Sequence, residues 1–120
     1  LANAAVNMDL NGPMTAGITH SAGSSFIFVN TPGVYKIEYS VSATQANQFA
    51  IYLNAVAVAS SRYGSGAGTQ QNTGVVVLNL AAGDGIQLYN NGSTGGSVNL
   101  VTNAGGTNTS VSASICITKL

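Results

Sequence analysis

The stretch TPGVYKIEYSVSA, residues 31–43, decides the fold class because its apolar and polar side chains alternate strictly. The apolar positions are Tyr35, Ile37, Tyr39, Val41 and Ala43, and the polar positions between them are Lys36, Glu38, Ser40 and Ser42. A period of two predicts a β-strand with one apolar face, and the preceding Pro32-Gly33 is a turn signal.

The end of the chain shows the same alternation. Val111, Ala113, Ile115 and Ile117 fall on one phase, with Ser112, Ser114, Cys116 and Thr118 on the other. Two strands that each carry one apolar face need a common core. The sequence therefore predicts that the last strand packs in the same domain as the strand from Gly33 to Ala43.

Further short segments between these two strands are rich in Val, Ile, Phe or Tyr, and turn signals separate them. They are Ser25–Val29, Phe49–Leu53, Val56–Ala59, Thr73–Leu80, Gly85–Asn90 and Ser97–Thr102. The chain has fifteen glycines and no long window with a helical repeat, so we predict an all-β antiparallel sandwich or barrel. The low-complexity stretch Ser60–Asn72 is expected to be the longest and most mobile loop.

Composition limits both the number of domains and the classes of partner. A chain of 120 residues is most simply one domain, with a core large enough to need neither a disulfide nor a metal. Only 5% of its residues are charged, the net charge is zero, and Lys36, Arg62 and Lys119 form no basic patch. We therefore expect no nucleic-acid partner, and no apolar run is long enough for membrane insertion. Because the sequence starts without Met, we interpret it as a fragment or a processed product.

Reactive groups are too few for an enzyme or a cofactor site. The sequence has one His, three carboxylates and one thiol, and it lacks a Gly-x-Ser-x-Gly motif beside His20-Ser21. Metal ligands are scattered singly, although three copies of His20 or of an Asp could share an ion on a symmetry axis. Asp84, between two glycines, is interpreted as a turn residue and Cys116 as a small buried or interface thiol. We expect no enzymatic activity, no cofactor and no metal site within one chain.

Four motifs in order carry a resemblance to a known family. They are Gly33-Val34-Tyr35-Lys36-Ile37, Leu53-Asn54-Ala55-Val56, Leu80-Ala81-Ala82-Gly83-Asp84 and the closing SVSASICITKL. The chain resembles the tumour-necrosis-factor-like jelly roll of complement globular heads and of C-terminal domains of bacterial collagen-like spore-surface glycoproteins of the BclA type. The family usually has Asn-Gly where this chain has Asn54-Ala55, and because Ala tolerates positive φ poorly, the turn there could be longer than two residues.

The resemblance implies one homotrimeric jelly-roll domain over residues 1–120, with residues 1–23 forming a peripheral first strand and a segment leading from a stalk. It also implies a position outside the cell, at the tip of a collagen-like filament in the exosporium of a spore. Composition supports an oligomer independently, because the chain is 45% hydrophobic and its mean hydropathy is +0.28. The alternatives are a glycan- or receptor-binding adhesion module on the same trimer, or a viral or phage fibre tip.

Polar positions that face away from the expected core are candidates for functional surfaces. The candidate trimer interface comprises Lys36, Glu38, Gln87, Tyr89, Cys116 and Thr118. Lys36 and Glu38 could fix the register between subunits, or both could simply face solvent. Arg62 and Tyr63 form a candidate ligand loop, because the flat rings of Tyr63 and Tyr89 suit stacking on a sugar. Two sequons, Asn91-Gly92-Ser93 and Asn108-Thr109-Ser110, matter only if the source glycosylates through asparagine.

Overall fold

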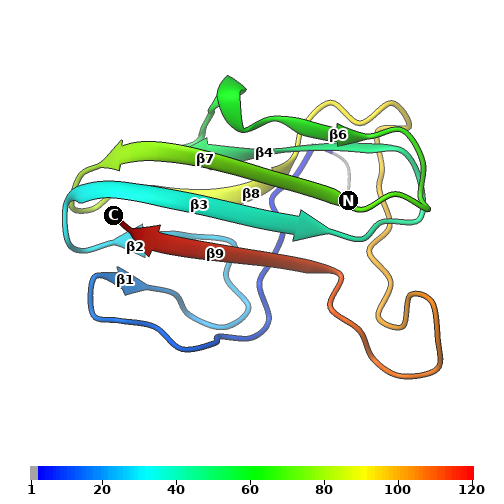
Figure 1. Ribbon diagram of the computed structural model, residues 1–120, viewed down its shortest axis with the longest axis horizontal. Helices are drawn as coiled ribbons and strands as arrows, with labels where there is room; N and C mark the ends of the chain where they lie inside the picture. The colour runs from blue at the N-terminus through cyan, green and yellow to red at the C-terminus, as the bar shows by residue number, and fades with distance from the viewer. Residues whose placement is uncertain (1–2) are drawn as a thin grey trace.

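The computed structural model describes residues 3–120 and consists of two antiparallel β-sheets that face each other (Figure 1). The strands are β1 (Ile18–Thr19), β2 (Ile27–Val29), β3 (Gly33–Val41), β4 (Asn47–Leu53), β5 (Val56–Ala57), β6 (Tyr63–Ser65), β7 (Asn72–Leu80), β8 (Gly85–Asn90) and β9 (Ala113–Lys119). A single turn of 3-10 helix, η1 (Ala59–Ser61), precedes β6. The prediction of an all-β chain with two antiparallel sheets is confirmed. Within residues 3–120, no helix has the length and apolar character needed to cross a membrane.

Both sheets join strands that are distant in the sequence. The six-stranded sheet has the order β1-β2-β8-β4-β5, with β6 also paired to β4. The three-stranded sheet has the order β7-β3-β9, so β3 is its central strand. The ladder between β3 and β7 spans Gly33–Val41, and the ladder between β3 and β9 spans Tyr35–Val41 of β3. The stretch that predicted the fold from the sequence is therefore the centre of one sheet.

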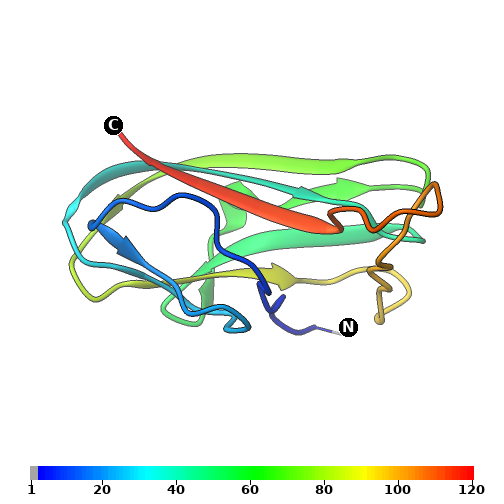
Figure 2. The same cartoon turned by 90° about the horizontal axis from the view of Figure 1, so that it is seen from below.

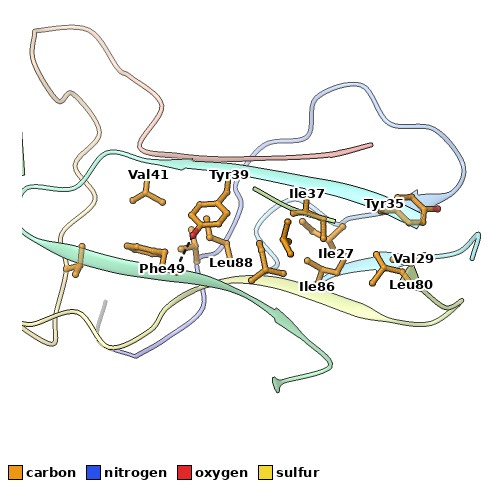
Figure 3. Close-up of a cluster of buried hydrophobic side chains, with 14 of the residues drawn as sticks. Ile27, Val29, Tyr35, Ile37, Tyr39, Val41, Phe49, Leu80, Ile86 and Leu88 are labelled. Atoms are coloured by element: carbon orange, nitrogen blue, oxygen red, sulfur yellow. Dashed lines mark hydrogen bonds between the residues drawn. The ribbon is translucent and has the colours of Figure 1, made fainter. Parts of the chain in front are cut away.

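The core lies between the two sheets and is built from the apolar phase of each strand (Figure 3). The three-stranded sheet contributes Tyr35, Ile37, Tyr39, Val41 and Leu80, and the six-stranded sheet contributes Ile27, Val29, Phe49, Ile51, Ile86 and Leu88. All of these side chains are buried. The alternation read from residues 31–43 correctly separates the core face of β3 from its outer face.

Tyr39 connects the two sheets through its hydroxyl group. The Tyr39 hydroxyl donates to the carbonyl oxygen of Ser61 at 2.7 Å and lies 2.9 Å from the carbonyl oxygen of Phe49 (Figure 3). Gly74 of β7 lies directly opposite Tyr39, and a Cβ atom there would meet the tyrosine ring at 2.4 Å. Burial of the Tyr39 hydroxyl raises its pKa from 10.0 to about 12, because the charged phenolate would lose its hydration. A glycine on one strand thus makes room for an inter-sheet tyrosine on the next.

The N-terminal segment closes one side of the sandwich. It runs between β9 and the edge formed by β2 and β8 (Figure 2). Ala5 forms an isolated bridge with Tyr89, and the backbone N–H of Val6 donates to the carbonyl oxygen of Leu88 at 2.8 Å. The Val6 side chain is buried in the core. The expected first strand is reduced to β1, which has two residues.

Two sequence-based assignments between residues 59 and 102 are wrong. Residues 97–102 form no strand, although Val98 is buried in the core as an apolar strand residue would be. The expected loop Ser60–Asn72 contains the end of η1 and all of β6. The two errors have opposite directions. At residues 97–102 the local composition predicts a strand that does not form, whereas at residues 60–72 it predicts a loop although β6 pairs with β4.

The turn between β4 and β5 has two residues despite the alanine at its second position. Leu53 pairs with Val56, so the longer turn that the sequence left open does not form. Asn54 has φ 49 and Ala55 has φ 68, as a type I′ turn requires. The side chain of Asn54 holds this turn, since its Oδ1 accepts from the N–H of Gly85 at 2.8 Å and its Nδ2 donates to Oδ1 of Asp84 at 2.9 Å. These bonds outweigh the strain at Ala55.

Replacing Ala55 by glycine is expected to stabilise the protein by about 0.5–1 kcal/mol, because glycine adopts this positive φ without steric cost. The Ala55 side chain is exposed, so little packing is lost. Chemical denaturation of the wild type and of Ala55→Gly measures the difference. Ala82→Gly is the matched control: it removes an exposed turn methyl where φ is not positive, and it should leave stability unchanged or lower it. A lower stability for Ala55→Gly would contradict the strained turn.

Candidate functional site

The outer face of the three-stranded sheet brings four of the six candidate interface residues together. On this face Lys36 lies between Val77 and Thr118 on the neighbouring strands. One row further along, Glu38 lies between Val75 and Cys116. We call this surface the valine face, and it comprises Val34, Lys36, Glu38, Val75, Val77, Cys116 and Thr118.

The valine face exposes branched aliphatic side chains that a lone β-sandwich would normally keep from water. Val34 and Val75 are each 43% exposed and Val77 is 54% exposed. A hollow of about 560 Å³ crosses all three strands of this face, between Thr73 and Val75 on β7 and Ser114 and Cys116 on β9. The face therefore combines three exposed valines with polar residues, has no net charge and is slightly concave, which suits contact with another protein surface.

Lys36 and Glu38 form an ion pair with each other within the chain. The Nζ atom of Lys36 lies 3.5 Å from Oε1 of Glu38, and both side chains are substantially exposed. It is the only ion pair in residues 3–120. An exposed pair of this kind stabilises a fold by about 0–1 kcal/mol, so its main effect is to neutralise two charges within an apolar surface.

Strand β9 forms one edge of the three-stranded sheet, and within residues 3–120 no strand pairs with its outer side. The N–H of Leu120 donates to the carbonyl oxygen of Val34, and the N–H of Ser42 donates to that of Ser112. In an antiparallel ladder this register turns the even-numbered backbone groups of β9 toward β3 and its odd-numbered groups toward the free edge. Such an edge tends to pair or pack with another chain unless something covers it.

The other two candidate interface residues, Gln87 and Tyr89, lie on the six-stranded sheet and not on the valine face. They project from the outer face of β8, because their neighbours Ile86 and Leu88 point into the core. Gln87 is buried and donates from Nε2 to the hydroxyl of Ser25 at 2.9 Å. The six residues therefore occupy two opposite surfaces of the sandwich, and a single flat interface can contain only four of them.

Tyr89 belongs to a cluster of polar and aromatic side chains. The sequence analysis named two of its members, Tyr89 and Arg62, and missed the other two. Its ring stacks on the ring of Tyr52, with centroids 3.9 Å apart. The Tyr52 hydroxyl accepts from Nδ2 of Asn91 at 2.8 Å, and Oδ1 of Asn91 accepts from Nε of Arg62 at 2.7 Å. The outward phase of β4 and β8 is a signal that could have located the two tyrosines. We call these four residues the arginine cluster.

Tyr63 does not join Arg62 in a ligand loop. Its hydroxyl donates to the carbonyl oxygen of Val75 at 3.2 Å, and its ring meets Tyr39 edge-on with centroids 6.4 Å apart. Tyr63 therefore connects β6 to β7. Tyr63 and Tyr89, which the sequence suggested as a joint stacking site, make separate ring contacts.

His20, Asp84 and the two sequons have local contacts of their own. His20 lies with Nε2 2.8 Å from the carbonyl oxygen of Ser24 and with Nδ1 against Oδ1 of Asn11, which fastens the N-terminal segment. The Asp84 carboxylate accepts from the N–H of Ala81 at 2.8 Å, which confirms its role in a turn. The hydrogen bonds from Ala81 and Asn54 lower the pKa of this carboxyl group.

The asparagines of the two sequons differ in their surroundings. Asn91 is held in the arginine cluster, whereas Asn108 lies exposed. Among residues 3–120, no three His, Cys, Asp or Glu side chains lie close enough together to hold a metal ion.

Comparisons with known proteins do not extend this description. No protein-family model matches the chain, and no curated protein is significantly similar to it. The class that the fold defines is the antiparallel β-sandwich, and its candidate functional surfaces are the valine face and the arginine cluster.

Proposed function

We propose that this chain is a structural self-association module, a trimeric jelly-roll head in which three copies bury their valine faces. The observation that carries the proposal is the exposure of Val34, Val75 and Val77 on a face that has no net charge. A full Val side chain removed from water contributes roughly 1.5–3 kcal/mol, so mutual burial of this face in three copies provides a substantial driving force. Lys36, Glu38, Cys116 and Thr118 then lie at contacts between subunits.

The strand order supports the jelly-roll part of the proposal. In one sheet β2, β8 and β4 are neighbours, and in the other β7, β3 and β9 are neighbours. Two facing antiparallel sheets whose neighbouring strands are remote in sequence are typical of jelly rolls, which consist of two Greek keys. The free edge of β9 lies beside the valine face, so a second subunit can cover both.

The motif order that resembles the BclA type supports a location for the trimer. We propose that it forms the distal tip of a collagen-like filament on a spore surface, outside the cell, where it aligns three chains for stalk assembly. A collagen triple helix needs its three chains in register, and a trimeric head sets that register. This role is structural and needs no catalytic group, cofactor or metal.

Sedimentation equilibrium or light scattering tests the proposal, and we expect a mass near 36 kDa, three times the 12.0 kDa of one chain. Replacing Val77 by lysine places three like charges in the buried interface and should dissociate the trimer at micromolar concentration. Val56→Lys is the matched control, because Val56 is even more exposed, at 67%, but lies on β5 of the six-stranded sheet. It should leave the mass unchanged.

A wild-type chain that sediments as a monomer at these concentrations would overturn the assembly proposal. Equal dissociation by Val56→Lys and Val77→Lys would also contradict it, because the interface would then not be the valine face. Circular dichroism of both variants checks that each retains the β-sheet structure before its mass is compared.

A further inference from the structure

The arginine cluster holds the one arginine of the chain at a fixed position on the outer face of the six-stranded sheet. Arg62 uses Nε to donate to Asn91, and Asn91 in turn is fixed by the Tyr52 hydroxyl. No carboxylate pairs with Arg62, since the only ion pair in residues 3–120 joins Lys36 and Glu38. The two terminal nitrogens of the guanidinium are therefore left as donors, in the fork geometry that suits a carboxylate.

Next to Asn91 the surface has a hollow of about 470 Å³, which we call the glycine hollow. It is lined by Ala46, Asn47, Gln48, Gly64, Ser65, Gly66, Gly92 and Thr94. Arg62 has an extended backbone, with φ −84 and ψ 116, so its side chain lies on the same side of the chain as residue 64. Asn91 directly precedes Gly92 of the lining. Arg62 does not line the hollow itself, but its hydrogen bond to Asn91 ties the guanidinium to the residue directly before Gly92.

The lining of the glycine hollow is polar but uncharged. The Gln48 carboxamide and the Thr94 hydroxyl form no hydrogen bond of their own with residues 3–120, so both are available to a ligand. The glycines leave backbone groups open at the surface, because no side chain covers them. The volume lies within the range of roughly 300–1,000 Å³ that small-ligand sites occupy.

We infer that the glycine hollow and Arg62 bind a saccharide that carries a carboxylate, such as a uronic acid. Neutral amide, hydroxyl and backbone groups suit the sugar hydroxyls, and the unpaired guanidinium suits the single negative charge. Asn91 and Tyr52 act as positioning residues, because they orient the guanidinium through their hydrogen bonds. The inference does not depend on the proposed trimer, since the site lies on the sheet opposite the valine face.

Titration followed by two-dimensional 1H-15N NMR tests the site with two probes, methyl β-D-glucuronide and methyl β-D-glucoside, which differ only in the carboxylate. We expect the glucuronide to shift the backbone amides of Gly64, Gly66 and Gly92 and the Arg62 Nε signal. The neutral glucoside should bind at least tenfold more weakly, because it has no carboxylate to accept charge-assisted hydrogen bonds from the guanidinium. Sodium acetate is the third probe and should also bind at least tenfold more weakly.

Two variants locate the binding, and each has a control. Arg62→Gln should weaken glucuronide binding at least tenfold, whereas Lys119→Gln, which removes the same charge from β9 of the other sheet, should leave it unchanged. Gly66→Gln should block the hollow without strain, because the φ of Gly66 is not positive and the nearest atom to an added Cβ lies 3.9 Å away. Unchanged glucuronide affinity in both Arg62→Gln and Gly66→Gln would overturn the inference. So would equal affinities for glucuronide and glucoside, or for glucuronide and acetate.

Discussion

Replacing Gly74 by alanine is expected to destabilise the fold by about 2–3 kcal/mol, an unusually large effect for one added methyl group. The new Cβ would lie 2.4 Å from the Tyr39 ring, well inside van der Waals contact. The ring cannot easily move, because it is buried and its hydroxyl bonds to Phe49 of the opposite sheet and to Ser61 of η1. Overpacking of a dense core costs about 1–3 kcal/mol, and displacement of the hydroxyl adds the loss of a buried hydrogen bond. Urea denaturation measures the change.

A double-mutant cycle identifies the cause of this destabilisation. In a Tyr39→Val background the ring is absent, so Gly74→Ala should cost at least 1 kcal/mol less than in the wild type. Gly64→Ala is the control: Gly64 also lies in a strand, but its added Cβ would have its nearest neighbour at 3.5 Å, an ordinary contact. If Gly74→Ala had the same cost in both backgrounds, the contact with Tyr39 would not be its origin.

Tyr39 is expected to make the protein sensitive to alkaline pH. Its pKa is about 12 in the folded chain and near 10 when unfolded, so the folded state holds the phenolic proton more tightly. This contribution to stability is fully present below pH 10 and is lost as the pH rises from 10 to 12. It amounts to about 3 kcal/mol at most. Urea denaturation at a series of pH values should show this fall.

Tyr39→Phe separates the hydroxyl from the ring. At neutral pH it should cost about 1–3 kcal/mol, because the carbonyl oxygen of Ser61 loses a buried donor. Between pH 10 and 12 this variant should lose less stability than the wild type. Tyr63→Phe, which removes the hydroxyl of a more exposed ring, should retain the wild-type alkaline loss. An alkaline loss of equal size in Tyr39→Phe would assign the effect to another group.

The sequence correctly predicted the strands whose apolar and polar side chains alternate. It failed for segments whose secondary structure depends on tertiary contacts. Residues 31–43 predicted β3 and its buried face, since an alternation that long has few other solutions. The strands that pair with β3 could not be predicted, because the alternation shows which side chains face the core but not which strands lie next to β3. Ser97–Thr102 shows the converse: Val98 is buried without being in a strand.

The candidate site was predicted in part for the same reason. Lys36, Glu38, Cys116 and Thr118 were correctly placed on one outer face, because β3 and β9 each alternate. Gln87 was grouped with them because its side chain also faces away from the core. The sequence does not show that its strand, β8, belongs to the other sheet. The link from Arg62 to Asn91 joins residues 29 positions apart and has no local signal.

The central place of β3 has a consequence for the timing of folding during synthesis. Its partner β9 ends at Lys119, so one complete ladder of β3 cannot form until the last residues of the domain have left the ribosome. Folds dominated by such long-range pairings form slowly, over milliseconds to seconds. Until β9 has been synthesised, the apolar face of β3 therefore lacks one of its two neighbouring strands.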